Sequence, residues 1–141
     1  MKKIYISIPI SGKDYQEQKS IAEKKAKELR GEGHWVVTPF ELVNENDPRQ
    51  NDYAYCMGRC VEALLKCDRI MLMDGWVESK GCTAEYLISF NYGLEITEND
   101  NGGGGTKRPR LLEPRPKRDG NVKRCQCKDR DFFFVKQQIV K

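Results

Sequence analysis

The chain has 141 residues, of which 38% are hydrophobic and 33% are charged, and its formal net charge is +4. This length supports one globular domain with an appended tail. No run reaches the roughly 18 to 20 consecutive apolar residues of a membrane helix, which excludes that class and predicts no membrane partner. The basic pair and apolar run at the start lack a signal-peptide cleavage site, so we expect a cytoplasmic protein.

Charge is divided unevenly along the chain. Residues 1–100 hold 13 Lys/Arg and 17 Asp/Glu, giving −4, whereas residues 101–141 hold 12 and 4, giving +8. We expect an α/β domain over residues 1–98, a flexible Gly-rich and basic linker over 99–118, and a basic C-terminal segment over 119–141 with an edge strand. The tail could bind nucleic acid or fold back on the acidic domain. The second is favoured, because the tail carries no known nucleic-acid motif.

Six cysteines stand at positions 56, 60, 67, 82, 125 and 127, and the one histidine is His34. The Cys125-x-Cys127 spacing is shorter than that of a zinc knuckle, and His34 is distant in sequence. We therefore expect free thiols in a reducing compartment, no metal and no cofactor.

Strand and helix signals alternate from the start of the chain. The apolar run 3–8 predicts a strand, and Asp14 can cap a helix that continues to about Arg30. Residues 35–37 predict a second short strand, which we expect Pro39 to stop.

The same alternation continues after a polar loop. Asp52 is expected to open a second helix, whose inward stripe would be Ala54, Met57, Val61, Leu64 and Leu65. The continuous apolar run 70–73 is typical of a strand buried on both faces. A third helix is expected over 82–92, ended by Gly93 in a left-handed conformation, with a fourth strand at 94–96.

This order predicts a three-layer Rossmann/flavodoxin-like α/β domain with a four- to five-stranded, mostly parallel sheet. Ligands of such sheets bind at the carboxyl ends of the strands. That rule selects the loops 7–13, 38–41 and 74–85.

The first loop holds Ser7, Pro9, Ser11 and Gly12 directly before a helix. Hydroxyls, backbone N–H groups and a glycine at a helix start can hold a phosphate. The same residues equally serve turn geometry and helix capping, so the pattern alone leaves both interpretations open.

The third loop, which begins at Asp74, carries more chemistry. Trp76 could stack on a base or cover the rim of the core, and Ser79, Lys80 and Gly81 could form a second anion site. Glu85 is expected near the first turn of the following helix, where the dipole favours its ionised form and its side chain points back to the strand ends. The alternative interpretation of Glu85 is a capping-box glutamate.

The Pro-x-Ser-Gly loop, the aspartate-led third strand and the run Asp74-Gly-Trp-x-x-Ser-x-Gly-Cys-Thr-Ala-Glu85 resemble the nucleoside 2-deoxyribosyltransferase superfamily over about residues 3–97. The most similar branches are the DUF4406 family and the 2′-deoxynucleoside 5′-phosphate N-hydrolases. Members place a serine or aspartate six residues before a nucleophilic glutamate, as Ser79 precedes Glu85 here.

The resemblance implies that Glu85 attacks the anomeric carbon of a nucleoside or nucleotide and that a glycosyl-enzyme passes the sugar to water or another base. It also implies a small-molecule nucleoside or nucleotide partner and a homo-oligomer. The substrate-binding residues that it implies, together with the loops above, are Ser7, Pro9, Ser11, Gly12, Asp74, Trp76, Ser79 and Gly81.

The chain departs from the family pattern at three positions. Ile8 stands where a glycine is usual, Ser11 where the monophosphate hydrolases have an arginine, and Cys60 where the family has a helical aspartate. A nucleotide-binding module of the same fold without turnover is therefore the alternative function.

Overall fold

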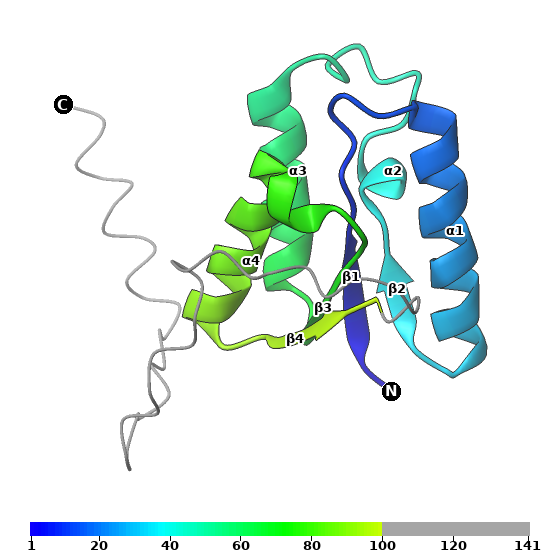
Figure 1. The fold of residues 1–141 in the computed structure, drawn as a ribbon, viewed down its shortest axis with the longest axis vertical. Helices are drawn as coiled ribbons and strands as arrows, with labels where there is room; N and C mark the ends of the chain where they lie inside the picture. The colour runs from blue at the N-terminus through cyan, green and yellow to red at the C-terminus, as the bar shows by residue number, and fades with distance from the viewer. Residues whose placement is uncertain (100–141) are drawn as a thin grey trace, which may run out of the picture.

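Four short parallel strands form the sheet in the computed structural model, which describes residues 1–99 (Figure 1). The expected C-terminal segment over 119–141, and all but the first residue of the expected linker, lie outside the described residues. The strands, in the spatial order β2-β1-β3-β4, are β1 (Lys3–Ser7), β2 (Trp35–Val37), β3 (Arg69–Leu72) and β4 (Glu95–Glu98).

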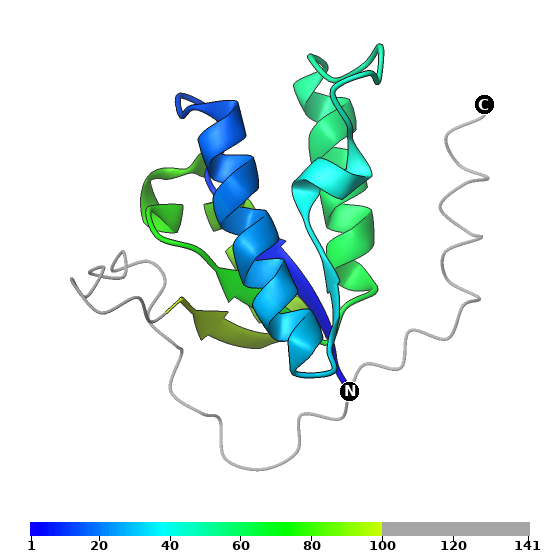
Figure 2. The same cartoon turned by 90° about the vertical axis from the view of Figure 1, so that its right-hand side faces the viewer.

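Helices cover both faces of this sheet, which confirms the expected three-layer architecture. α1 (Tyr15–Gly31) lies on one face, whereas α3 (Tyr53–Leu65) and α4 (Lys80–Tyr92) lie on the other (Figures 1 and 2). A 3-10 turn, η1 (Trp76–Glu78), precedes α4. No helix within residues 1–99 is long and apolar enough to cross a bilayer.

The central strand β1 supplies the core of both layers. Ile4 and Ile6 pack with the α1 side of the sheet, while Tyr5 faces the side covered by α3 and α4. Successive side chains of a strand point to opposite faces, so Ser7 shares the face of Tyr5. All four side chains are fully buried, as expected for a parallel sheet sandwiched between helices.

Local capping signals set the helix ends. The side chains of Asp14 and Asp52 accept hydrogen bonds from Glu17 N at 2.8 Å and Tyr55 N at 3.2 Å, which confirms both predicted helix starts. Gly93 ends α4 with a φ of 72°, as predicted, because only glycine adopts this conformation without strain.

The start of α4 differs from the prediction. The helix begins at Lys80 rather than Cys82, because Ser79 takes the N-cap position and its Oγ accepts a hydrogen bond from Cys82 N at 3.3 Å. Glu85 therefore lies in the second turn of α4, not in its first.

A short helix, α2 (Pro39–Leu42), occupies a segment where Pro39 was expected only to stop a strand. Proline is well suited to the first turn of a helix, where its missing N–H group has no partner to lose. The Glu41 carboxylate accepts a 2.9 Å hydrogen bond from Thr38 N and so caps the start of this helix.

The inward face of α3 is rotated relative to the predicted stripe. Cys60 and Leu64 are the buried residues of this helix, whereas Ala54 and Leu65 are exposed. Cys60 and Leu64 are four positions apart and so share one face, and the thiol of Cys60 packs there as a small apolar group. The prediction failed because it left cysteine out of the apolar pattern.

Candidate functional site

A cavity of about 410 Å³ opens at the carboxyl ends of the strands. Its lining comes from the loop after β1, from α2, from α3 and from the start of α4, the edge where ligands of parallel sheets bind. The lining residues used below include Ser11, Cys60, Ser79, Gly81, Cys82 and Glu85.

Glu85 forms the buried end of this cavity. Its side chain reaches from α4 to β1, and the residue is 5% exposed. The Tyr5 hydroxyl donates to Oε1 at 2.8 Å, and the Ser7 hydroxyl donates to Oε2 at 2.5 Å. Each carboxylate oxygen therefore has a fixed donor, which holds the carboxylate in one orientation.

Burial raises the pKa of the Glu85 carboxyl above its ordinary value of 4.5, while the hydrogen bonds from Ser7 and Tyr5 oppose this shift. This corrects the expectation that a helix dipole governs the group. The carboxyl lies in the second turn of α4, beyond the end of the helix where the dipole acts most strongly, and removal from water dominates. Burial and the nearby Glu85 charge in turn raise the pKa of Tyr5 well above its ordinary value.

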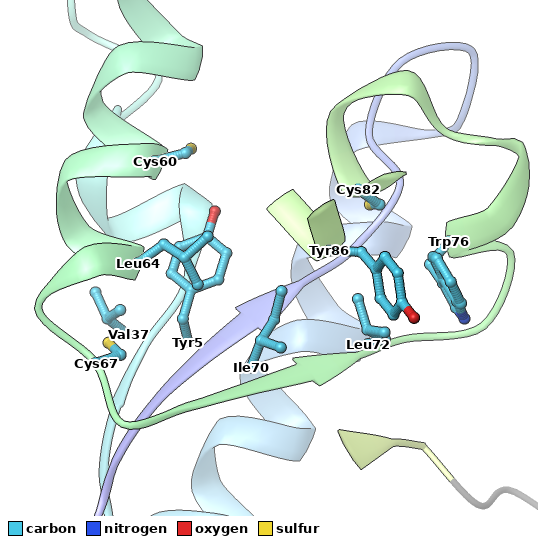
Figure 3. Close-up of a cluster of buried hydrophobic side chains, with 10 residues drawn as sticks. All are labelled: Tyr5, Val37, Cys60, Leu64, Cys67, Ile70, Leu72, Trp76, Cys82 and Tyr86. Atoms are coloured by element: carbon cyan, nitrogen blue, oxygen red, sulfur yellow. The ribbon is translucent and has the colours of Figure 1, made fainter. Parts of the chain in front are cut away.

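Two buried thiols, those of Cys60 and Cys82, lie near the carboxylate. Figure 3 shows Cys60 on α3 with the hydroxyl end of Tyr5 pointing toward it, and Cys82 on α4 at the opposite side. Burial raises the pKa of the Cys60 thiol to about 11, although its contact with the Tyr5 hydroxyl acts in the other direction. Cys60 is therefore neutral at physiological pH. No group of three or more His, Cys, Asp or Glu side chains in residues 1–99 is arranged to hold a metal ion.

The structure brings together five of the nine residues singled out from the sequence. Ser11, Ser79, Gly81 and Glu85 line the cavity, and Ser7 contacts Glu85 beneath it. Ser7 and Ser11 come from the end of β1 and the loop after it, and the other three come from the start of α4 and the residue before it. The sheet places these two segments at one edge.

Three other predicted residues lie outside the lining. Pro9 is buried beside Gly75, where a Cβ added to the glycine would lie 3.6 Å from the proline ring. Gly12 occupies an exposed turn with a φ of 75°, and Asp74 is exposed. Pro9 and Gly12 therefore shape the first loop, and Asp74 faces solvent.

Trp76 does not lie where it could stack on a base. It is 1% exposed, and its ring stacks on Tyr86 with centroids 5.0 Å apart in the core between the sheet and α4 (Figure 3). Stacking on Tyr86 and burial of the apolar indole surface favour this position.

Tyr5 is the site residue that the sequence analysis missed. An aromatic residue in a buried strand is expected to be core, and Tyr5 is part of the core. The available signal was its spacing from Ser7, because two hydroxyl-bearing residues two positions apart on a buried strand point to the same face. Such a pair needs polar partners in the covering layer.

The four-stranded parallel sheet with helices on both faces has the fold of deoxyribosyltransferase-like solved structures. The 2-deoxyribosyltransferase of Bacillus psychrosaccharolyticus aligns with a TM-score of 0.53 at 22% identity, covering 68% of this chain and 70% of that one. A conserved protein from Enterococcus faecalis V583 aligns with a TM-score of 0.55 at 18% identity, covering 75% and 69%. At these identities the likeness is one of fold.

The chain belongs to the DUF4406 family, described as a domain of unknown function, whose model matches residues 2–98. A CMP N-glycosidase of Clostridium botulinum also aligns, with a TM-score of 0.46 at 21% identity, over 69% of this chain and 70% of that one. No curated protein sequence matches the chain.

Proposed function

We propose that this protein breaks the N-glycosidic bond of a nucleoside or nucleotide, with Glu85 as the nucleophile, and passes the sugar to water or to another base. The observation that carries the proposal is the Glu85 carboxylate, buried at the end of the cavity and oriented by Tyr5 and Ser7. The fold shared with a 2-deoxyribosyltransferase makes this the first chemistry to test.

In the proposed reaction a Glu85 oxygen attacks the anomeric carbon as the carbon–nitrogen bond breaks. The bonding electrons leave with the base, which takes up a proton from solvent water, and a glycosyl ester of Glu85 forms. Water or the nitrogen of a second base then attacks the same carbon, gives its proton to solvent and releases the carboxylate. The negative charge also stabilises the oxocarbenium-like transition states that precede and follow the ester.

A nucleotide-binding module without turnover is the second candidate, and Cys60 favours it. Glycoside-cleaving sites usually use two carboxyl groups, one of them as an acid. Among the cavity-lining residues of the described chain, Glu85 is the one carboxylic acid. Cys60, with a pKa of about 11, is a weak proton donor near pH 7.

The proposal is tested by incubating the full chain with 2′-deoxynucleosides and their 5′-monophosphates and measuring the free base by chromatography. Glu85→Gln is expected to abolish release, whereas Glu78→Gln, a matched change at an exposed glutamate, should leave it unchanged. Intact mass spectrometry of quenched reactions should show the wild type carrying one sugar.

Release of base that persists in Glu85→Gln would contradict the nucleophile. Ligand-induced thermal stabilisation of the wild type without any release would instead support the binding module.

A further inference from the structure

The chemical nature of the cavity lining changes from its buried end to its rim. Glu85, Cys60 and Cys82 are buried at one end, and apolar side chains of Phe40, Val43 and Met57 form part of the wall. The exposed lining residues include three amides from the loop between α2 and α3, which are Asn44, Gln50 and Asn51. A complementary ligand would have one end that can lie against the Glu85 carboxyl group and an apolar middle part that packs on the wall. Its other end would carry hydrogen-bonding groups for the amides at the rim.

The three amides supply donors and acceptors in the way that a base edge requires. Asn44 Oδ1 accepts a 2.8 Å hydrogen bond from Asn46 N, which orients the amide and leaves its NH₂ group for a ligand. The side chains of Gln50 and Asn51 have no hydrogen-bond partner within residues 1–99. Asn and Gln amides pair with the donor and acceptor edges of nucleobases.

The cavity lining offers no cationic side chain to a phosphate. Within the described chain no lysine or arginine lines the cavity, and Glu85 is its one carboxylic acid. A phosphate would therefore enter a partly desolvated site without a cation to balance its charge. At the start of α4, Ser79 Oγ caps Cys82 N, which takes one N–H group away from a ligand.

We propose that this cavity binds an uncharged nucleoside in preference to its 5′-phosphate, with the sugar over Glu85 and the base against Asn44, Gln50 and Asn51. This rests on the proposed function for the placement of the sugar. The choice of an uncharged ligand rests on the charge and amide pattern of the cavity.

Calorimetric titration of the full chain with a 2′-deoxynucleoside and with its 5′-monophosphate tests the choice of ligand. At least about tenfold tighter binding of the nucleoside is expected. Ser11→Arg should reduce this preference by placing a cation in the lining, whereas Ser20→Arg, on the exposed part of α1 and outside the cavity, should not. Equal or tighter binding of the monophosphate by the wild type would overturn the inference.

The amide contacts are tested by Gln50→Ala and Asn51→Ala, each expected to weaken nucleoside binding about fivefold or more. Asn91→Ala, at an exposed position of α4 outside the cavity, is the matched control. Unchanged binding in both rim variants would contradict the proposed placement of the base. Tighter binding of the nucleoside without release of its base would contradict the proposed function but support the inference about the ligand. Binding of neither compound would contradict both.

Discussion

Tyr5 and Glu85 stand 80 positions apart in the chain, and the hydroxyl of the first donates a 2.8 Å hydrogen bond to the carboxylate of the second in the protein interior. The bond joins the first strand of the sheet to the last helix of the α3–α4 layer. A buried carboxylate needs such donors, because leaving it without a partner costs several kcal/mol. The Tyr5–Glu85 hydrogen bond in the site therefore also connects the sheet to the α3–α4 layer.

Tyr5→Phe removes the donor to Oε1 and keeps the ring. Loss of a hydrogen bond to a buried charge costs about 1–3 kcal/mol, so kcat is expected to fall about tenfold to a hundredfold. The pKa of Glu85 should also rise, because a contact that lowers it is gone. A shift of the acidic limb of the pH–rate profile to higher pH checks the positioning role, and Tyr92→Phe, at an exposed position, should leave the profile in place.

Stability should depend on pH through Glu85. Its folded-state pKa lies above the ordinary 4.5, so the folded protein holds this proton more tightly than the unfolded chain does. The resulting stabilisation is fully present below pH 4.5 and is lost as pH rises through the folded-state pKa.

Glu85→Gln lacks this proton equilibrium and serves as the reference. Relative to Glu85→Gln, the free energy of unfolding of the wild type should decline in urea titrations as the pH rises above 4.5. A constant difference between the two proteins over this range would show that the carboxyl is not perturbed.

Cys60→Asp places a second carboxyl beside Tyr5, where the superfamily pattern has an aspartate. If the proposed reaction lacks an acid, this variant should release base faster than the wild type, whereas Cys60→Ser should not. The added buried acid should lower the free energy of unfolding by about 1–3 kcal/mol. Steady-state rates and urea denaturation of the same samples separate the two effects, and a rate no higher than that of Cys60→Ser would argue against an acid role at this position.

Trp76→Ala should act on stability and not on the cavity. Removing a fully buried indole costs about 3–5 kcal/mol, whereas the same change at half-exposed Trp35 should cost much less. Nucleoside affinity of the folded Trp76→Ala protein should stay within about twofold of the wild type. A larger loss of affinity would show that Trp76 contributes to nucleoside binding.

Local signals account for the parts of the fold that the sequence predicted. The caps at Asp14 and Asp52 and the glycine at Gly93 act through their own backbone neighbours and can be recognised without tertiary information. Pro39 is ambiguous because proline both ends strands and begins helices, and the pair Thr38 and Glu41 distinguishes the two cases here.

The site was predictable only in part, for a different reason. Glu85 and Ser79 share one loop and helix start, so their spacing carries the signal. Tyr5 depends on a partner 80 positions away, and Trp76 depends on Tyr86 to bury its ring. Contacts of that range are set by the packing of layers, which local sequence patterns do not reveal.

Because Tyr5 and Ser7 alternate with Ile4 and Ile6 along β1, the strand register decides which set faces α4. A slip by one residue would set isoleucines against the Glu85 carboxylate and turn the hydroxyls toward the apolar side of α1. Misaligned and half-assembled chains would thus lose the contacts of Glu85 together with the core, so binding of the proposed nucleoside ligand should report correct folding.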